Sequence, residues 1–184
     1  MNFFISDNHW QHKNIIQYCN RPFRDSSGLA DVHYMNRTMT EKWNSVVGLE
    51  DTVYHLGDFS MGNPGKYREK LNGKIVLILG NHDRRSQCQG HFDEIHDSLE
   101  IDLSGNKILL SHLYYSDMLD NNFDHKFKDK MPKYDQSRIL IHGHAHNSKP
   151  HINEKYKAIN VSAEHLDYIP MSETKIIKTI NQFK

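Results

Sequence analysis

The stretch Lys74-Ile75-Val76-Leu77-Ile78-Leu79-Gly80-Asn81-His82-Asp83 joins a short aliphatic run directly to a polar turn. A short run rich in Ile, Val and Leu and closed by glycine favours a buried strand over a helix. Side chains that can bind a metal ion or a phosphate follow the run without a spacer. The stretch therefore predicts a core strand, 74–79, that presents chemically active residues at its carboxyl end.

The same arrangement recurs along the chain, and each recurrence predicts another strand. The other aliphatic runs are Asn2–Ile5, 52–56, 107–110, 138–141 and 158–161. The polar turns after the first four of these are Ser6-Asp7-Asn8-His9, Gly57-Asp58, Ser111-His112 and His142-Gly143-His144-Ala145-His146. No such cluster follows the last run. Ligands of open α/β sheets gather beyond the carboxyl ends of the strands, so we expect the five polar turns to meet in one cleft.

Helical patterns lie between the early strands. Residues 32–47 place Met35, Met39 and Trp43 at helical spacing. Two shorter candidates are 14–19 and 66–71. Strands and helices alternate early and strands alone follow later, which predicts a layered α/β sandwich with mixed sheets. The segment 114–137 is rich in Asp, Asn, Lys and Phe without a sustained apolar period, so we expect a loop or lid there.

The composition limits the size of the fold and the class of partner. A chain of 184 residues is in the range of one compact domain, so we expect a single domain over 1–184. Lys plus Arg and Asp plus Glu number 23 each, and this balance argues against long nucleic acids or an anionic membrane as partners. The 14 histidines are more than a surface needs, and imidazole is the commonest metal ligand. The composition therefore indicates metal binding.

The two cysteines, Cys19 and Cys88, are too few for a disulfide framework and lack the close pairing of a thiolate zinc site. The longest aliphatic run, 75–79, is far short of a membrane span. The first residues lack the basic start and the apolar stretch of a signal peptide. We therefore expect a cytoplasmic protein without a membrane segment.

Each motif is weak alone, because Asp-x-His or Gly-Asp is common in ordinary turns. Their order is informative: Asp-x-His, Gly-Asp, Gly-Asn-His-Asp, His and Gly-His-x-His, each at the end of a predicted strand. In this order the sequence resembles the calcineurin-like metallophosphoesterases over nearly the whole chain. It is most similar to the small bacterial and phage phosphoesterases of that family, through 7–16, 20–23 and 52–59. The family usually has a small residue such as Thr where this chain has Asn8.

The resemblance implies a four-layer α/β/β/α sandwich, in which two mixed β-sheets are flanked by helices. It also implies a centre of two divalent metal ions, with manganese expected and iron, zinc or nickel as alternatives. Asp58 would bridge the two ions. By the family pattern, one ion is held by Asp7, His9 and His146, and the other by Asn81, His112 and His144.

The resemblance further implies hydrolysis of a phosphodiester or phosphomonoester by metal-activated hydroxide. In this scheme His82 is the general acid for the leaving group, and Asp83 orients it. Arg21 is a candidate for clamping a substrate phosphate. The neutral charge and the missing capping domain favour a small, nucleotide-like substrate.

Other functions fit the sequence less well. A nuclease acting on short or single-stranded nucleic acid stays open, because the same centre can cleave a nucleic-acid backbone. A non-catalytic binding scaffold of the same fold is less favoured, since neither a ligand nor the acid is missing. A metallo-β-lactamase-type hydrolase is excluded, because the chain has no His-x-His-x-Asp-His run. The sequence leaves the oligomeric state open.

Overall fold

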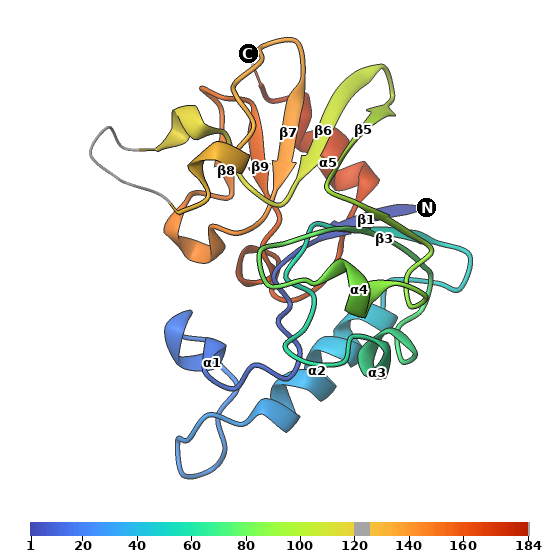
Figure 1. Cartoon of the computed structure of the whole chain (residues 1–184), viewed down its shortest axis with the longest axis vertical. Helices are drawn as coiled ribbons and strands as arrows, with labels where there is room; N and C mark the ends of the chain where they lie inside the picture. The colour runs from blue at the N-terminus through green and yellow to red at the C-terminus, as the bar shows by residue number, and fades with distance from the viewer. Residues whose placement is uncertain (120–125, 184) are drawn as a thin grey trace.

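The computed structural model describes residues 1–119 and 126–183. Within this part of the chain the strands form two five-stranded sheets (Figure 1). In spatial order, the first sheet has β10 (Met171–Ser172), β1 (Asn2–Ile5), β2 (Thr52–His55), β3 (Lys74–Ile78) and β4 (Glu94–His96). The second has β5 (Ser98–Leu103), β6 (Asn106–Ser111), β7 (Ile139–His142), β9 (Ala158–Asn160) and β8 (Ile152–Asn153). Each of the six predicted runs forms a strand.

Both sheets combine parallel and antiparallel pairs. The pairs β1–β2, β2–β3 and β3–β4 are parallel, and β10 joins β1 in antiparallel orientation. In the second sheet β6–β7 and β7–β9 are parallel, while β5 and β8 pair antiparallel at the edges. The predicted α/β fold with two mixed sheets is therefore confirmed.

The core between the sheets follows from alternation along the strands. Successive side chains of a strand point to opposite faces, so Ile108 and Leu110 of β6 enter the inter-sheet core while Leu109 packs on the outer face. Phe4 of β1 and Ile78 of β3 enter the same core from the first sheet. The two sheets thus share one apolar layer.

Helices cover the outer face of the first sheet (Figure 1). They are α1 (Ile15–Tyr18), α2 (Val32–Asn44), α3 (Gly65–Arg68) and α4 (Arg85–Cys88). In α2 the predicted residues Met35, Met39 and Trp43 are fully buried. Its first turn is capped by the Asp31 carboxylate, which accepts hydrogen bonds from the amides of His33 and Tyr34.

The outer face of the second sheet is covered by an extended segment instead of an α-helix. Tyr115, Met118 and Met131 of this segment pack against Leu109 and Leu140. It contains two short 3₁₀ helices, η1 (Ser116–Met118) and η2 (Lys128–Lys130). The predicted loop or lid, 114–137, is therefore a packed layer where it is described, and 120–125 lie outside the described residues. On this side the predicted helical flank consists of these two 3₁₀ helices and the chain around them.

Several elements have no clear signal in the sequence. The expectation of strands alone in the later half is wrong, because α5 (Glu173–Ile180) ends the described chain and buries Ile176 and Ile180 in the inter-sheet core. Short 3₁₀ helices also follow two strands, as η3 (His146–Ser148) and η4 (Ala163–Leu166). Among the described helices, none is both long enough and apolar enough to cross a membrane.

The two sheets are joined where β1 and β9 end. The Ser6 amide donates a hydrogen bond to the Val161 carbonyl at 3.0 Å, and the Ala163 amide donates one to the Ser6 carbonyl at 3.0 Å. This isolated parallel bridge brings the carboxyl ends of both sheets to one place. The polar turns that follow β1, β2, β3, β6 and β7 are thereby gathered.

Candidate metal centre

The backbone of the predicted site is held in unusual conformations. Five of the predicted ligands have positive φ: Asp7 (57°), His9 (52°), Asp58 (54°), His144 (65°) and His146 (44°). Residues other than glycine rarely adopt this left-handed region, and such strain clusters at functional sites. Five of the eleven non-glycine residues with positive φ in the described part of the chain thus lie in the polar turns singled out by their sequence.

Two glycines allow these turns to approach each other. A Cβ atom on Gly80 would lie 2.3 Å from the Asp58 amide nitrogen. A Cβ atom on Gly143 would lie 2.4 Å from Ser6 Oγ and 2.5 Å from Asp7 Oδ2. Both distances are shorter than any real Cβ contact, so only glycine fits at either position.

One cluster brings together Asp7, His9 and His146, whose ligand atoms lie within 4.8 Å of one another. The Asp7 Oδ1 atom is 4.0 Å from His9 Nε2 and 3.7 Å from His146 Nε2. The other oxygen, Oδ2, accepts hydrogen bonds from Ser6 Oγ, Ser162 Oγ and the His144 amide. These bonds fix the carboxylate so that Oδ1 faces the two imidazoles.

A second cluster contains Asp58, His112 and His144, again within 4.8 Å. His112 Nδ1 donates to the Leu56 carbonyl at 2.8 Å, because a carbonyl oxygen can only accept. His112 Nε2 lies 3.0 Å from Asn81 Oδ1 and 3.5 Å from Asp58 Oδ2. Asp58 Oδ2 is also 3.5 Å from His9 Nε2. This oxygen therefore lies between the two clusters.

The donor set fits divalent cations. Asp7 Oδ1 and both ring nitrogens of His9 are buried and have no hydrogen-bond partner among the described residues. Burying such groups unpaired costs about 1–3 kcal/mol each, and a bound cation would satisfy Asp7 Oδ1 and one ring nitrogen of His9. Carboxylate, amide and imidazole ligands suit first-row divalent metals.

The electrostatics of the site are consistent with cation binding. Burial lowers the pKa of His9 well below its usual value, which keeps the imidazole neutral and able to bind a metal. Burial raises the pKa of the Asp58 carboxyl, and the neighbouring His112 offsets this only in part. A cation at this position would stabilise the carboxylate form.

Glu164 supports the first cluster, although the sequence pattern gives no signal for it. Its Oε1 atom accepts from His146 Nδ1 at 2.9 Å. The same oxygen accepts from Arg21 Nε at 2.9 Å and Nη2 at 2.6 Å. A carboxylate on Nδ1 of a histidine fixes the ring tautomer, so that Nε2 is left for a metal.

The predicted role of Arg21 as a phosphate clamp is wrong. Its side chain has an exposed fraction of 0%. Besides Glu164, its guanidinium donates to the backbone carbonyls of Asp7 at 2.7 Å and Asn8 at 2.8 Å. Arg21 thus holds Glu164 and the strained turn after β1 from within the protein.

His82 and Asp83 lie at the same turn but do not pair as predicted. The Asp83 carboxylate accepts from the amides of Asp58, Phe59 and Gly80 at 2.7, 3.1 and 2.9 Å. It therefore fixes the turn that holds Asp58 and does not orient the His82 ring. The His82 side chain is exposed, its ring centroid is 5.5 Å from that of His9, and its amide donates to Asp58 Oδ1 at 2.8 Å.

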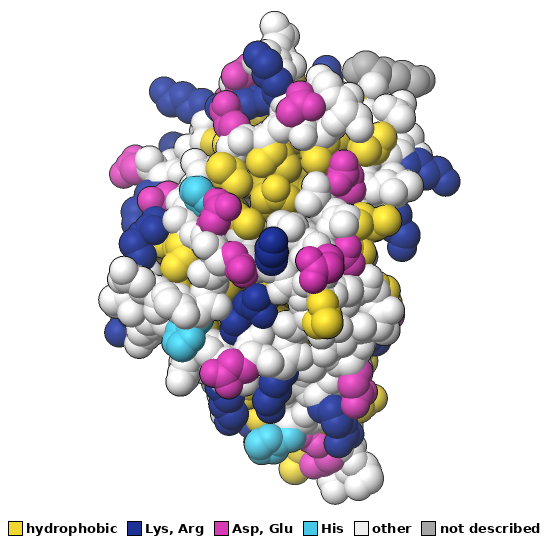
Figure 2. Space-filling view, turned by 90° about the vertical axis from the view of Figure 1, so that its right-hand side faces the viewer, with side chains coloured by type: hydrophobic (Ala, Val, Ile, Leu, Met, Phe, Trp, Pro, Cys, Tyr) yellow, Lys and Arg dark blue, Asp and Glu magenta, His cyan; other side chains and the backbone are white. Residues whose placement is uncertain are grey.

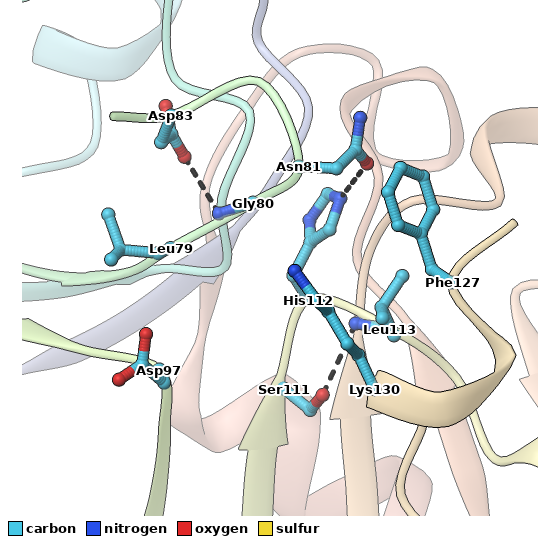
Figure 3. A pocket seen from close by; sticks show the side chains of 10 residues that line it. All are labelled: Leu79, Gly80, Asn81, Asp83, Asp97, Ser111, His112, Leu113, Phe127 and Lys130. Atoms are coloured by element: carbon cyan, nitrogen blue, oxygen red, sulfur yellow. Dashed lines mark hydrogen bonds between the residues drawn. The ribbon is translucent and has the colours of Figure 1, made fainter. Parts of the chain in front are cut away.

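A cavity of about 460 Å³ adjoins the second cluster. Asn81 and His112 form part of its wall, and side chains from the segment over the second sheet line another part (Figure 3). The lining residues are Leu79, Gly80, Asn81, Asp83, Asp97, Ser111, His112, Leu113, Phe127 and Lys130. The site therefore has room for a small ligand beside the candidate metal ligands.

A family model of the calcineurin-like phosphoesterase superfamily domain matches residues 28–163. The chain belongs to this superfamily. The predicted family is confirmed, and with it the predicted class of enzyme, a metal-dependent phosphoric ester hydrolase that acts on a phosphate ester. In this superfamily member the clusters around Asp7 and Asp58 are among the groups that could hold metal.

Three relatives match this phosphoesterase over most of its length. Uncharacterized protein MJ1445 of Methanocaldococcus jannaschii is 38% identical, with 99% of this chain and 92% of that protein covered. Gene 66 protein of Mycobacterium phage L5 is 30% identical, covering 88% and 86%. The crystal structure of AQ665 from Aquifex aeolicus, a protein of unknown function, has a TM-score of 0.69 and 31% identity, covering 97% and 98%.

Proposed function

We propose that this phosphoesterase uses two divalent metal ions to hydrolyse small, nucleotide-like phosphodiesters or phosphomonoesters. The observation that supports the proposal best is the position of Asp58 Oδ2, 3.5 Å from His9 Nε2 and 3.5 Å from His112 Nε2. An oxygen equidistant from one histidine of each cluster is suited to bridging two cations. A small anionic ligand is needed there, because two cations close together repel each other.

Seven side chains would hold the ions. Asp58 would be shared, with Asp7, His9 and His146 on one side and Asn81, His112 and His144 on the other. Bound ions would supply Lewis-acid stabilisation of charge on the phosphoryl oxygens and lower the pKa of water. Manganese suits this mixture of oxygen and nitrogen ligands, and iron, zinc and nickel are the alternatives to test.

The chain's own residues supply the remaining chemistry. The exposed His82 ring lies beside the His9 ring and is a member of neither candidate metal cluster. It would donate a proton to the leaving-group oxygen, since an alkoxide is expelled poorly without one. Asp83 contributes indirectly, by holding the backbone of Asp58 and Gly80.

A small substrate is favoured over long nucleic acid. Lysines and arginines number the same as acidic residues. On the face shown in Figure 2, basic and acidic side chains are interspersed and neither sign forms a continuous area. A protein that follows a nucleic-acid backbone needs a positively charged track, whereas a cavity of about 460 Å³ has the size of small-molecule sites.

The experiment is a metal-reconstitution assay. Protein stripped of metal by chelation should not hydrolyse bis(p-nitrophenyl) phosphate or p-nitrophenyl phosphate, and manganese should restore hydrolysis of at least one of them. His144→Ala should abolish this recovery, whereas His33→Ala, at an exposed position of α2, should not. Full activity in protein verified as free of metal would reject the proposal.

A further inference from the structure

The cavity beside the second cluster has two chemical faces that the proposed metal centre does not explain. Leu79, Leu113 and Phe127 give it an apolar wall, and Lys130 adds a cation. The Phe127 ring is 5.8 Å from the ring of His144, so the apolar wall reaches the candidate metal ligands. These features describe a binding site for the rest of the substrate.

Lys130 is the most informative of these residues. It ends η2 (Lys128–Lys130), and its side chain points into the cavity toward the side formed by Asn81 and His112 (Figure 3). Within residues 1–119 and 126–183, no carboxylate forms an ion pair with its ammonium group. Of the two acidic side chains that line the cavity, Asp97 is paired with Arg85 at 3.0 Å, and Asp83 accepts hydrogen bonds from backbone amides. Among the described residues, Lys130 is thus a cation without a carboxylate partner.

We propose that Lys130 binds a negatively charged phosphoryl oxygen of the substrate and makes the site prefer phosphomonoesters to phosphodiesters. The inference rests on the proposed phosphoesterase function and names its substrate class. A phosphomonoester has a second pKa of about 6 and bears close to two negative charges at neutral pH, whereas a diester bears one. An additional cation beside the phosphate therefore interacts more strongly with the monoester.

The remaining space indicates what the phosphate is attached to. Ligand sites of this size are mostly apolar with a few placed polar groups. This cavity combines an aromatic ring and two leucines with one lysine and the two carboxylates of Asp83 and Asp97, which already have partners. A nucleoside monophosphate matches both faces, because its phosphate is close to dianionic and its base has a flat aromatic face. Phe127 offers an aromatic surface for such a base.

The test compares Lys130→Gln with the matched control Lys128→Gln, which removes a charge from the same 3₁₀ helix at a position outside the cavity. Each manganese-loaded protein is assayed for kcat/KM with p-nitrophenyl phosphate and with bis(p-nitrophenyl) phosphate. Loss of a charged hydrogen bond should reduce the monoester value in Lys130→Gln by about tenfold, with the diester value nearly unchanged. Lys128→Gln should resemble the wild type with both substrates. Equal losses on both esters, or no loss on the monoester, would overturn the proposal.

A binding measurement separates this inference from the proposed function. Titration calorimetry with inorganic phosphate, which is mostly dianionic at pH 7.5, is performed on the same manganese-loaded proteins. The affinity should fall by about tenfold in Lys130→Gln and stay constant in Lys128→Gln. If the wild type hydrolyses neither ester, the proposed function fails while the phosphate affinity still decides the role of Lys130. An unchanged affinity in Lys130→Gln would reject that role.

Discussion

The Oε1 atom of Glu164 accepts three hydrogen bonds, two from Arg21 and one from His146. This makes Glu164 the link between a buried cation and a candidate metal ligand. His112 in the other cluster has only a backbone carbonyl, that of Leu56, on its Nδ1 atom. A carboxylate partner makes an imidazole a stronger ligand than a carbonyl partner does, so the two clusters of candidate ligands are electrostatically unequal.

Glu164→Gln should weaken one of two manganese sites by about 10–100-fold, the usual effect of losing a partner of a metal ligand. The amide can still accept a hydrogen bond, but it no longer offers a negative charge to His146. Calorimetric titration with manganese should show one weakened and one unchanged site. Glu173→Gln is the control. Glu173 Oε2 accepts a hydrogen bond from Asn2 Nδ2 at 2.8 Å, far from the two clusters in the fold. Two unchanged affinities would contradict the role assigned to Glu164.

His82→Ala should retain bound metal but lose about 10²–10⁴-fold in rate with substrates whose leaving group is a poor one. The physical reason is that an alkoxide needs a proton from the general acid, whereas nitrophenolate leaves readily without one. The rates of an alkyl ester and a p-nitrophenyl ester are compared in wild type and variant. Equal losses with both esters, or loss of metal, would show that His82 has another role.

The residues of the two clusters could be predicted from the sequence, because each lies in a short motif directly after an apolar run. Ser162 and Glu164 follow the run 158–161 without a recognisable motif, and their importance arises from the bridge between Ser6 and Ser162. Arg21 has an ambiguous signal, since an arginine near a phosphate site suggests substrate binding. Only its complete burial beside Glu164 shows that its role is internal.

The turns after β2 and β3 approach so closely that their glycines are essential. Gly80→Ala should lower the free energy of unfolding by about 1–3 kcal/mol, as overpacking does, and displace the Asp58 carboxylate. Urea unfolding measures the loss of stability, and manganese binding reports the displacement of the Asp58 carboxylate. Gly48→Ala is the control, because its added Cβ would meet only the flexible Asp51 side chain, at 3.3 Å. A Gly80→Ala protein with wild-type stability and metal affinity would be inconsistent with this packing.

Aliphatic runs predicted the central strands well because those strands are buried on both faces. The edge strand β5 escaped prediction since its residues alternate between exposed and half-buried, with Glu100 and Asp102 on the exposed side. The two-residue strands β8 and β10 exist only through pairing with their neighbours. Helix α5 is short, and its burial depends on the core between the two sheets. The residues of the helix alone therefore do not predict it.

Two buried histidines couple the stability of the whole protein to pH. Burial lowers the pKa of His55 to about 3 and that of His142 to about 4. Both therefore stay neutral in the folded protein below pH 6.5, while the unfolded chain takes up a proton at each site near that pH. The unfolded state then binds more protons, so the stability that is present above about pH 6.5 is lost as the pH falls.

As the pH falls from about 6 to the folded pKa of each histidine, that histidine should lower the free energy of unfolding by about 1.4 kcal/mol per pH unit. His55→Phe removes one of the two groups that take up a proton on unfolding, so the free energy of unfolding should fall less steeply with falling pH. The variant also loses the hydrogen bond between His55 Nε2 and Asn8 Oδ1. Urea unfolding at pH 6.5 and 5.0 gives the slope, with His33→Phe as an exposed control. Identical slopes in wild type and His55→Phe would refute the assignment.

The centre between the two sheets is tested most directly by counting bound metal. Protein dialysed against manganese and analysed for metal should contain two ions per chain, because Asp58 Oδ2 lies between the two clusters of candidate ligands. Asp58→Asn should lose both ions, whereas Asp102→Asn, which alters only the cap of the turn between β5 and β6, should keep both. One ion per chain in the wild type, or two ions in Asp58→Asn, would contradict a shared carboxylate at the centre.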